Sequence, residues 1–324
     1  MKRFITLLFV FICALSQFAI SAFAQDWPNR PVRIVNTFAV GGAADILARM
    51  VAEHMSGVFG QQFVVETRSG AGGMVGVQSV AHAEPDGYTF GITTISLLVF
   101  APITNPRSGF DPQRDLTNVA YIAGSPIVFV TNPVYGVKTL RDFVDAAKKS
   151  SKPLTYSSSG VGSNGQLVAE SFAQQAGIRL EHVPYRGAAQ GLTDLIGGHI
   201  FFSSQTVSSS SGHIRGGTLL PLAHTSSARL PDYPDVPTFK ELGYPELVTT
   251  NWFALSGPPG ILKDIVEKVN REVVRAMQKP EIQARLRQDG LMAEALNVEQ
   301  FKTFIESEAI RWKPVIERAE LVGK

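Results

Sequence analysis

Two hydrophobic patterns alternate along most of this chain. Short apolar runs rich in β-branched residues predict β-strands, whereas segments with apolar residues three and four positions apart predict amphipathic helices. The predicted strands are residues 32–38, 63–67, 88–94, 127–131, 154–158, 180–185, 200–204 and 219–224. Strands that alternate with helices in this way are typical of an α/β protein with mainly parallel sheets.

The predicted helices fall between these strands and near the C-terminal end of the chain. One covers residues 45–55, with its apolar side chains on a single face, and another ends at Gly177, because glycine is common at helix C-termini. The last three predicted helices are residues 262–277, 280–288 and 298–320. The serine-rich run at residues 208–211 is interpreted as a loop or as the polar start of a helix.

The beginning of the chain has the pattern of a secretory signal peptide, covering residues 1–24. Lys2-Arg3 precedes an apolar run, and Ala22-Phe23-Ala24 matches an A-x-A cleavage site. The apolar run is short for a signal anchor, the alternative, because a membrane span needs about 20 apolar residues. We therefore expect cleavage before Gln25 and a periplasmic location. Cys13 is the only cysteine, so the mature chain would contain no disulfide.

The mature chain is long enough to divide into two lobes. Without the leader it has 300 residues, more than the roughly 250 at which single hydrophobic cores tend to split. Proline, glycine and serine are concentrated at residues 123–126 and 230–237, where the chain could cross between lobes. We expect lobe 1 to comprise residues 25–124 plus 248–324 and lobe 2 residues 125–247, with a ligand cleft between them.

The charge balance argues against a nucleic-acid partner. Without Lys2 and Arg3 the chain has 28 basic and 28 acidic residues, so its net charge is zero with neutral histidines. Binding to phosphates requires a basic excess or a clustered basic face.

A glycine-centred loop at residues 36–45 is the most informative segment for chemistry. Gly41 and Gly42 lie between a β-branched run and an amphipathic helix, where glycine permits the turn and leaves backbone N–H groups exposed. The positive end of the helix dipole adds to these N–H groups, so such a loop can bind an anion. In an exported protein this indicates capture of a small anion.

A second glycine pattern, G-x-G-x-x-G at residues 160–165, raises the alternative of a dinucleotide site. It follows a predicted strand, and Glu181 could serve as the ribose-binding carboxylate. However, the pattern is mid-chain rather than in a first βα unit, and the exported compartment is poor in nicotinamide cofactors. The serine hydroxyls at 157–159 and at Ser163 could instead bind a carboxylate, or simply cap the following helix.

Local signatures of several other functions are missing from the sequence. The glycine-rich segment 69–76 lacks the Gly-Lys-Ser/Thr of a nucleotide P-loop, and neither G-x-S-x-G nor H-E-x-x-H occurs. We therefore predict no cofactor, no metal and no catalytic residue, and expect a binding protein rather than an enzyme. An exported hydrolase or lyase stays open as the alternative, because catalytic groups assembled across a cleft need no local spacing.

Arginine and aromatic side chains add candidate contacts. Arg186 follows a predicted strand, where its guanidinium could bind a carboxylate through two hydrogen bonds or could bond carbonyls of its own lobe. Phe38, Trp252 and Phe253 could line an apolar slot, although core packing competes for at least one of them.

Segments spread through the whole mature chain share the pattern of one known family. They are residues 27–35, 38–45, 64–66, 70–76, 85–89, 160–163, 182–187, 194–198 and 234–238. The chain thereby resembles the substrate-binding proteins of tripartite tricarboxylate transporters, the TctC/Bug family. The resemblance implies a two-lobed periplasmic binding fold, each lobe a mainly parallel sheet flanked by helices. Such a protein closes on a small carboxylate and passes it to membrane permease subunits.

The resemblance also implies a set of ligand contacts. One ligand carboxylate would be held, partly through ordered waters, by the first strand-loop-helix at Phe38, Ala39, Val40, Gly41, Gly42 and Ala43. The far end would meet Thr94, Ser96, Ser158, Ser159, Gly162, Ser163, Asn164, Arg186, Ser204, Gln205 and Thr206. Asp45 matches an acid of the family, and we expect it to brace the loop because a carboxylate would repel an anion.

Departures from the family pattern bear on the ligand. Asn36-Thr37 replaces an apolar residue and proline, Gln166 stands where histidine is frequent, and Gln205 replaces an aspartate. Without that aspartate a ligand ammonium group loses its partner, so a dicarboxylate is favoured over an amino acid. Hydroxyl donors beside aromatic rings would suit an aromatic acid such as terephthalate. We expect a monomer that serves a permease, with a sensor kinase as an alternative partner.

Overall fold

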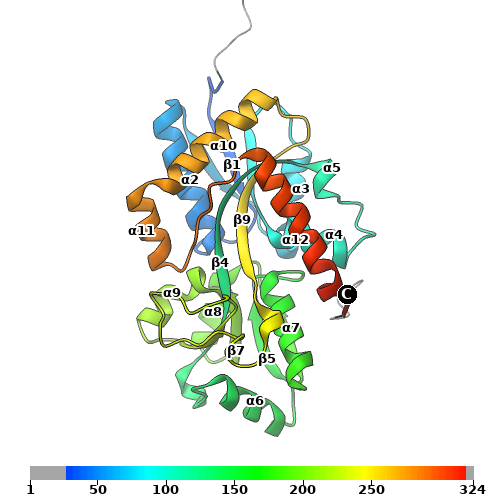
Figure 1. Ribbon diagram of the computed structural model, residues 1–324, viewed down its shortest axis with the longest axis vertical. Coiled ribbons are helices and arrows are strands. Elements are labelled where there is room, and N and C mark those ends of the chain that lie inside the picture. The colour runs from blue at the N-terminus through cyan, green and yellow to red at the C-terminus, as the bar shows by residue number, and fades with distance from the viewer. Residues whose placement is uncertain (1–26, 319–324) are drawn as a thin grey trace, which may run out of the picture.

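The computed structural model describes residues 27–318, so the predicted signal peptide, its cleavage site and Cys13 lie outside the described residues. The described chain is an α/β protein with two lobes stacked along the long axis of the molecule (Figure 1). One path of hydrogen-bonded strands runs through both lobes in the order β2-β1-β3-β9-β4-β7-β5-β6, and β8 pairs with β4.

Strands and helices alternate along the chain as the hydrophobic pattern predicts. The strands are β1 (Val32–Asn36), β2 (Phe63–Thr67), β3 (Thr89–Thr94), β4 (Thr117–Thr131), β5 (Leu154–Ser158), β6 (Leu180–Pro184), β7 (Phe202–Thr206), β8 (Leu220–His224) and β9 (Thr250–Gly257). The α-helices are α2 (Ala43–Phe59), α3 (Met74–Ala81), α4 (Ala101–Thr104), α5 (Pro112–Asp115), α6 (Leu140–Lys149), α7 (Asn164–Ala176), α8 (Ala188–Ile196), α9 (Val207–Arg215), α10 (Lys263–Gln278), α11 (Pro280–Gln288) and α12 (Val298–Arg318). Shorter helical turns are η2 (Ala71–Gly73), η3 (Ser96–Phe100, a π-helix), η4 (Pro133–Tyr135) and η5 (Pro245–Leu247).

The first lobe is built on β1, β2 and β3, which are parallel, and on β9, which is antiparallel to β3 and to the first part of β4. α2 connects β1 to β2 and α3 connects β2 back past β1 to β3. Because such crossovers are right-handed, the two helices cover opposite faces of the sheet. α10 packs against α2 and β4, and α12 packs against β4 and η3. In Figure 1 these helices surround the upper sheet.

The second lobe repeats this plan with parallel β5, β6 and β7, while β4 is antiparallel to β7 and to β8. Alternate residues of β4 point to opposite faces, as the two-residue period of a strand requires. Ile127 and Phe129 join a core with Phe172, whereas Val128 and Val130 join a core with Leu192. α7 therefore covers one face of this sheet and α8 the other.

β4 and β9 connect the lobes, and both differ from the sequence prediction. The predicted strand at residues 127–131 is only the end of the 15-residue β4. The punctuation at residues 123–126 lies inside the strand, because Gly124 provides space: a Cβ there would lie 2.4 Å from Thr250 Cγ2. Pro126 is opposite Thr250, where the ladder to β9 ends, and from Ile127 onward the strand pairs with β7. β9 itself was not predicted.

Two alternatives left open by the sequence are decided near the lobe junction. The serine-rich run at residues 208–211 lies at the start of α9, which confirms the second of its two interpretations, the polar start of a helix. Trp252 of β9 does not line a ligand slot, because it is 1% exposed and its Nε1 donates to the Glu308 carboxylate at 3.2 Å. Its ring packs against Tyr121 and Phe301 in the core of the first lobe.

His224 at the end of β8 is a buried titratable side chain. The residue is 1% exposed, and its Nδ1 accepts a hydrogen bond from the Ser226 N–H at 3.3 Å. Its Nε2 has no hydrogen-bond partner among the described residues. Burial lowers the pKa of His224 to about 4. The folded chain therefore holds this ring neutral at pH values where an unfolded histidine is already charged.

Replacing His224 is expected to reduce the loss of folding stability that occurs as the pH falls. The unfolded chain takes up a proton at this position below about pH 6.5, whereas the folded chain does so only near pH 4. Between those values protons favour unfolding, so stability falls as the pH falls. Melting temperatures from pH 7 to pH 4 should show a smaller decrease for His224→Gln than for the wild type. The same substitution at the exposed His82 is the control, and equal slopes for His224→Gln and wild type would contradict the expectation.

Candidate functional site

The carboxyl ends of β1, β3, β5 and β7 meet between the lobes, and several helices begin there. Between them lies a cavity of about 40 Å³, here called the anion cavity. It is lined by Phe38, Ala39, Gly42, Ala43, Ala44, Ser96, Ser159, Ala188, Gln205, Thr206, Ser209, Asn251 and Phe253. Ligands of open α/β sheets bind at the carboxyl ends of the strands, so this is the expected place for a ligand. The present volume holds only a few water molecules.

The first helix brings an uncapped N-terminus to this cavity. Gly42 is the N-cap of α2 and provides no side-chain hydrogen bond. Gly42 and Ala44 line the cavity, and their backbone N–H groups have no hydrogen-bond partner among the described residues. Unpaired N–H groups at a helix N-terminus carry partial positive charge, which stabilises an anion.

Asp45 braces this loop, as expected from its position in the first helical turn. Its carboxylate accepts hydrogen bonds from the Gly41 N–H at 3.2 Å and from Asn36 Nδ2 at 3.4 Å, and it forms an ion pair with Arg49 at 3.1 Å. The Asn36 side chain also accepts from the Phe38 N–H at 3.2 Å. Asn36, which departs from the family pattern, therefore helps to fix the loop conformation. Asp45 does not belong to the lining of the cavity, and Arg49 balances its charge.

Two helices of the second lobe begin at the same cavity. α8 starts at Ala188 after Gly187, which provides no side-chain cap. α9 is capped by Thr206, whose hydroxyl accepts from the Ser209 N–H at 3.2 Å and donates to Ser209 Oγ at 2.8 Å. N-termini from both lobes thus converge on one small volume, which favours negative charge there.

Three buried polar atoms beside these N-termini lack partners. Thr94 Oγ1, Asn164 Oδ1 and Gln205 Nε2 have no hydrogen-bond partner among the described residues, and each residue is at most 3% exposed. A buried polar group without a partner costs about 1–3 kcal/mol. Of the three residues, Gln205 lines the anion cavity, where a bound polar ligand or an ordered water would recover that cost.

The anion cavity has no ionisable side chain in its lining. Its polar groups are hydroxyls, amides and backbone N–H groups, and its apolar walls include Phe38 and Phe253. An anion would therefore be held by hydrogen bonds and helix dipoles rather than by an ion pair. The same neutral lining provides no carboxylate for a ligand ammonium group.

The structure brings about half of the predicted contact residues to the anion cavity. They are Phe38, Ala39, Gly42, Ala43, Ser96, Ser159, Gln205 and Thr206. Thr94 and Asn164 are buried at the lobe junction, and the Asn164 N–H donates to Ser96 Oγ at 3.0 Å.

The other predicted residues lie outside this lining. Val40 is 56% exposed, and the Ser204 hydroxyl donates to the Gly165 carbonyl at 2.7 Å instead of facing the cavity. Arg186 is exposed, and it contacts the other lobe through its backbone carbonyl, which accepts a hydrogen bond from the Ala39 N–H at 3.0 Å. Gly162 and Ser163 line a neighbouring cavity.

Four lining residues were not predicted from the sequence: Ala44, Ala188, Ser209 and Asn251. Ser209 belongs to the serine-rich run at residues 208–211, for which the polar start of a helix is one of the two interpretations from the sequence. Its hydroxyl accepts a hydrogen bond from the Ala43 N–H at 3.2 Å, across the lobes. Asn251 had no local signal, since it belongs to the unpredicted strand β9.

Ser158 and His182 form a serine–histidine pair beside the site. Ser158 Oγ lies 2.7 Å from His182 Nε2, and it also accepts hydrogen bonds from the Gly160 N–H and from the Ser163 hydroxyl. Burial lowers the pKa of His182 to about 4, so the ring is neutral at neutral pH. Its Nε2 donates to or accepts from the Ser158 hydroxyl according to the tautomer, and that hydroxyl is also within 3.0 Å of the Gly160 carbonyl, to which it can donate. Because Ser158 is 0% exposed, its contacts fix the loop between β5 and α7 and it is not presented to a substrate.

The two lobes are in contact around the cavity. In addition to the Ala39–Arg186, Ala43–Ser209 and Ser96–Asn164 hydrogen bonds, the backbone at Gly72 lies against Val161 of the opposite lobe. A Cβ at Gly72 would be 2.3 Å from the Val161 carbonyl oxygen. The described structure is therefore a closed arrangement in which the cavity is small.

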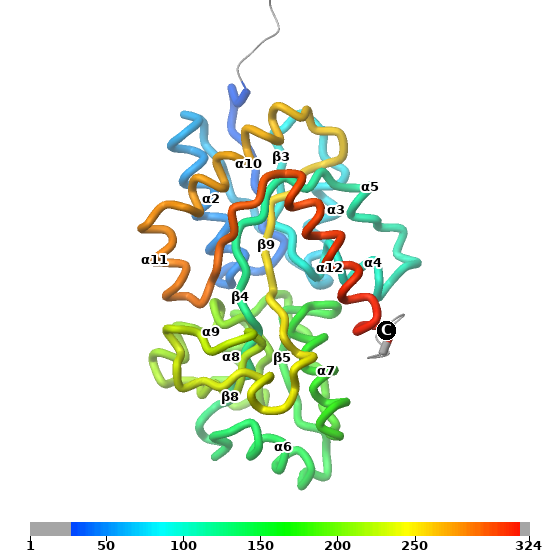
Figure 2. Tube along the Cα trace, viewed as in Figure 1, coloured from blue at the N-terminus to red at the C-terminus, as the bar shows by residue number. Residues whose placement is uncertain are grey.

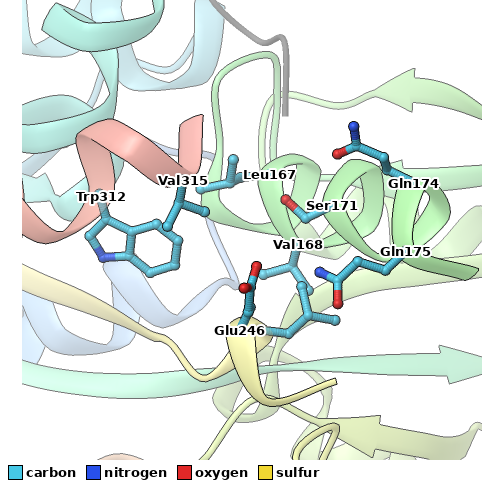
Figure 3. Close-up of a pocket in the computed structure, with 9 residues that line it drawn as sticks. Leu167, Val168, Ser171, Gln174, Gln175, Glu246, Trp312 and Val315 are labelled. Atoms are coloured by element: carbon cyan, nitrogen blue, oxygen red, sulfur yellow. The ribbon is translucent and has the colours of Figure 1, made fainter. Parts of the chain in front are cut away.

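A larger cavity of about 330 Å³ lies elsewhere, between α7, η5 and the end of α12 (Figure 3). Figure 3 shows Trp312 and Val315 on one side and Ser171, Gln174 and Gln175 on the other. Glu246 belongs to its lining, and the only helix that begins within this lining, among the described residues, is the three-residue turn η5. An acidic lining without the N-terminus of an α-helix opposes anion binding, so we do not assign the principal site to this cavity.

The fold and the site together are typical of one class of proteins, the two-lobed extracytoplasmic solute-binding proteins. Among the described residues, no helix is both long enough and apolar enough to cross a lipid bilayer. The model of the tripartite tricarboxylate transporter family receptors, TctC, matches residues 47–321. The chain belongs to this family of solute-binding receptors, and its fold is that of the periplasmic binding proteins.

A named relative and two solved structures support the assignment to this family. The chain is 31% identical to BugT of Bordetella pertussis over 317 residues, which cover 98% of this chain and 97% of BugT. A solved R. palustris protein with adipate is 32% identical, with a TM-score of 0.87 over 91% of this chain and 99% of that one. MatC of Rhodopseudomonas palustris with bound malate is 27% identical, with a TM-score of 0.85 over 90% of this chain and 100% of MatC.

Gly72→Ala is expected to hold the lobes apart. The new Cβ would collide with the Val161 carbonyl of the opposite lobe, so the closed arrangement should lose population and the radius of gyration in solution scattering should increase. Gly60→Ala is the matched control, since Gly60 has nearly the same positive φ, 65° against 64°, but nothing within 4 Å of its Cβ. Identical scattering curves for the two variants would contradict the role of this contact.

Proposed function

We propose that the chain is a periplasmic receptor that captures a small carboxylate between its lobes and delivers it to a permease of the tripartite tricarboxylate type. The observation that carries this proposal is the convergence of helix N-termini from both lobes, with unpaired N–H groups at Gly42 and Ala44, on a cavity without ionisable side chains. Backbone N–H groups and hydroxyls hold one carboxylate, and bridging waters can complete the contacts.

The ligand is a dicarboxylate rather than an amino acid. Gln205, which stands in place of the family's aspartate, presents an unpaired amide nitrogen that can donate to a second carboxylate. An amino acid would place its ammonium group in a cavity lacking any carboxylate, and burying an unpaired charge is costly. Adipate and malate, bound by two related proteins, are dicarboxylates. Terephthalate has no such support, although Phe38 and Phe253 provide apolar walls.

In the proposed function, the ligand is captured between the two lobes of the chain. The proposed lobe 1 comprises residues 25–124 plus 248–324 and lobe 2 residues 125–247, with β4 and β9 crossing between them. The anion cavity of about 40 Å³ is smaller than a dicarboxylate, so the lobes separate to admit the ligand. Export by the N-terminal leader places this cycle in the periplasm.

A ligand panel tests the function. Purified mature protein is expected to gain stability with one or more of succinate, malate, adipate and terephthalate, and none with glutamate or glucose. Ligand at 100 times its Kd contributes about 2.7 kcal/mol to unfolding free energy, which thermal melting detects. Absence of stabilisation by every carboxylate would overturn the proposal. Prolonged incubation followed by mass analysis separates a receptor, which returns the acid unchanged, from the alternative hydrolase or lyase.

Gly42→Asp is expected to abolish carboxylate binding without unfolding the chain. Gly42 has extended backbone, φ −92° and ψ 176°, and Asp is a favourable N-cap residue, so the new carboxylate would bond the N–H groups meant for the ligand. Affinity should fall roughly 100-fold or more through like-charge repulsion. Gly42→Ala is the control, because its Cβ makes only ordinary contacts at 3.9–4.0 Å. Calorimetric titration of both variants checks this, and equal affinities would argue against the α2 N-terminus as the anion site.

A further inference from the structure

A second cavity between the lobes shares a residue with the anion cavity. It has a volume of about 240 Å³, and we call it the side cavity. Ser96 lines both cavities. The side cavity lies between η2, η3 and α4 of the first lobe and the start of α7 in the second. Figure 2 shows α4 and α7 on the same side of the molecule, one in each lobe. Because the side cavity has walls from both lobes, these walls approach each other when the lobes close.

The lining of the side cavity is mostly apolar and has no ionisable side chain. The apolar part is contributed by Met74, Leu97, Phe100, Ala101, Val161 and Leu167. The polar part of the lining consists of Ser96, Thr104, Asn105, Ser108, Ser163 and Gln166. Of these, Asn105 and Ser108 are exposed and therefore lie at the solvent side. Such a cavity suits a hydrocarbon chain or ring, with a polar end near water.

One side chain from each cavity lies beside Gly73. Phe38 lines the anion cavity and Leu97 lines the side cavity. A Cβ at Gly73 would lie 3.1 Å from Phe38 Cζ and 3.1 Å from Leu97 Cδ1. The two cavities therefore approach each other near Gly73, and rotation about the side-chain torsions of Phe38 and Leu97 would let a ligand reach from one cavity into the other.

We propose that the side cavity holds the hydrocarbon body of the ligand whose carboxylate binds at the N-terminus of α2. The inference rests on the proposed function and narrows it to dicarboxylates longer than succinate, with the second carboxylate near Asn105 and Ser108. Each methylene transferred from water to the side cavity raises affinity about fourfold. The chain thus selects its ligand by hydrocarbon length, through apolar contact rather than through charge.

A series of linear dicarboxylates tests this inference on the mature protein. Calorimetric titration should give suberate at least a tenfold lower Kd than succinate, with adipate between them. Ala101→Phe fills the side cavity from the first lobe, and Val161→Phe, at a residue 53% exposed, fills it from the second. Either variant should weaken suberate at least tenfold and change succinate less than threefold. Val134→Phe, at a residue 74% exposed and remote from the cleft, is the control.

The outcomes separate the inference from the function on which it rests. If succinate binds as tightly as suberate, or if neither filling variant affects suberate, the side cavity is not a ligand site although the receptor function stands. If no dicarboxylate binds the wild type, both the function and the inference are overturned. Melting curves of the variants confirm that each is folded before titration. Because the two substitutions fill the side cavity from opposite lobes, the test remains decisive even if one variant does not fold.

Discussion

The antiparallel ladder between β4 and β9 is the constraint on which the rest of this structure depends. It runs from the Thr117–Gly257 pair to the Pro126–Thr250 pair, after which β4 continues into the second sheet. Because one strand belongs to both sheets, the carboxyl ends of β1 and β3 face those of β5 and β7. The helices that follow these strands consequently begin on either side of the same narrow space, and their dipoles add there.

This arrangement explains how an acid can be recognised without a counter-ion. Free N–H groups on α2, the uncapped start of α8 and hydroxyls at Thr206 and Ser209 create a positive potential from neutral groups. Gln205 lines the anion cavity and its Nε2 has no partner among the described residues, and a buried polar atom without a partner is costly. In the proposed receptor a bound carboxylate would remove that cost, so ligand binding would stabilise the arrangement in which the lobes are in contact.

Recognition divides between backbone and side chains. In the proposed site, the backbone N–H groups at the α2 N-terminus are unaffected by most substitutions and would bind any carboxylate. The far end would be formed by side chains such as Ser96, Gln205 and Leu97, which line the two cavities. Related receptors bind adipate and malate, acids that share a carboxylate and differ in the body between the two ends. Ligand choice is therefore expected to reside in side chains at a distance from the anion-binding loop.

The sequence by itself determined the α/β class, the helix bounds near the C-terminus, the strand-loop-helix at residues 36–45 and the family, because these depend on local periodicity, glycine and ordered motifs. It failed at β9 and at the first part of β4, since Gly124 and Pro126 resemble turn residues until the opposing strand is known. Only the tertiary structure placed Asn251 and Ser209 at the cavity and left the Arg186 side chain outside it. Those assignments depend on which segments face each other across the lobes, and long-range strand pairing leaves no periodic signal in the chain.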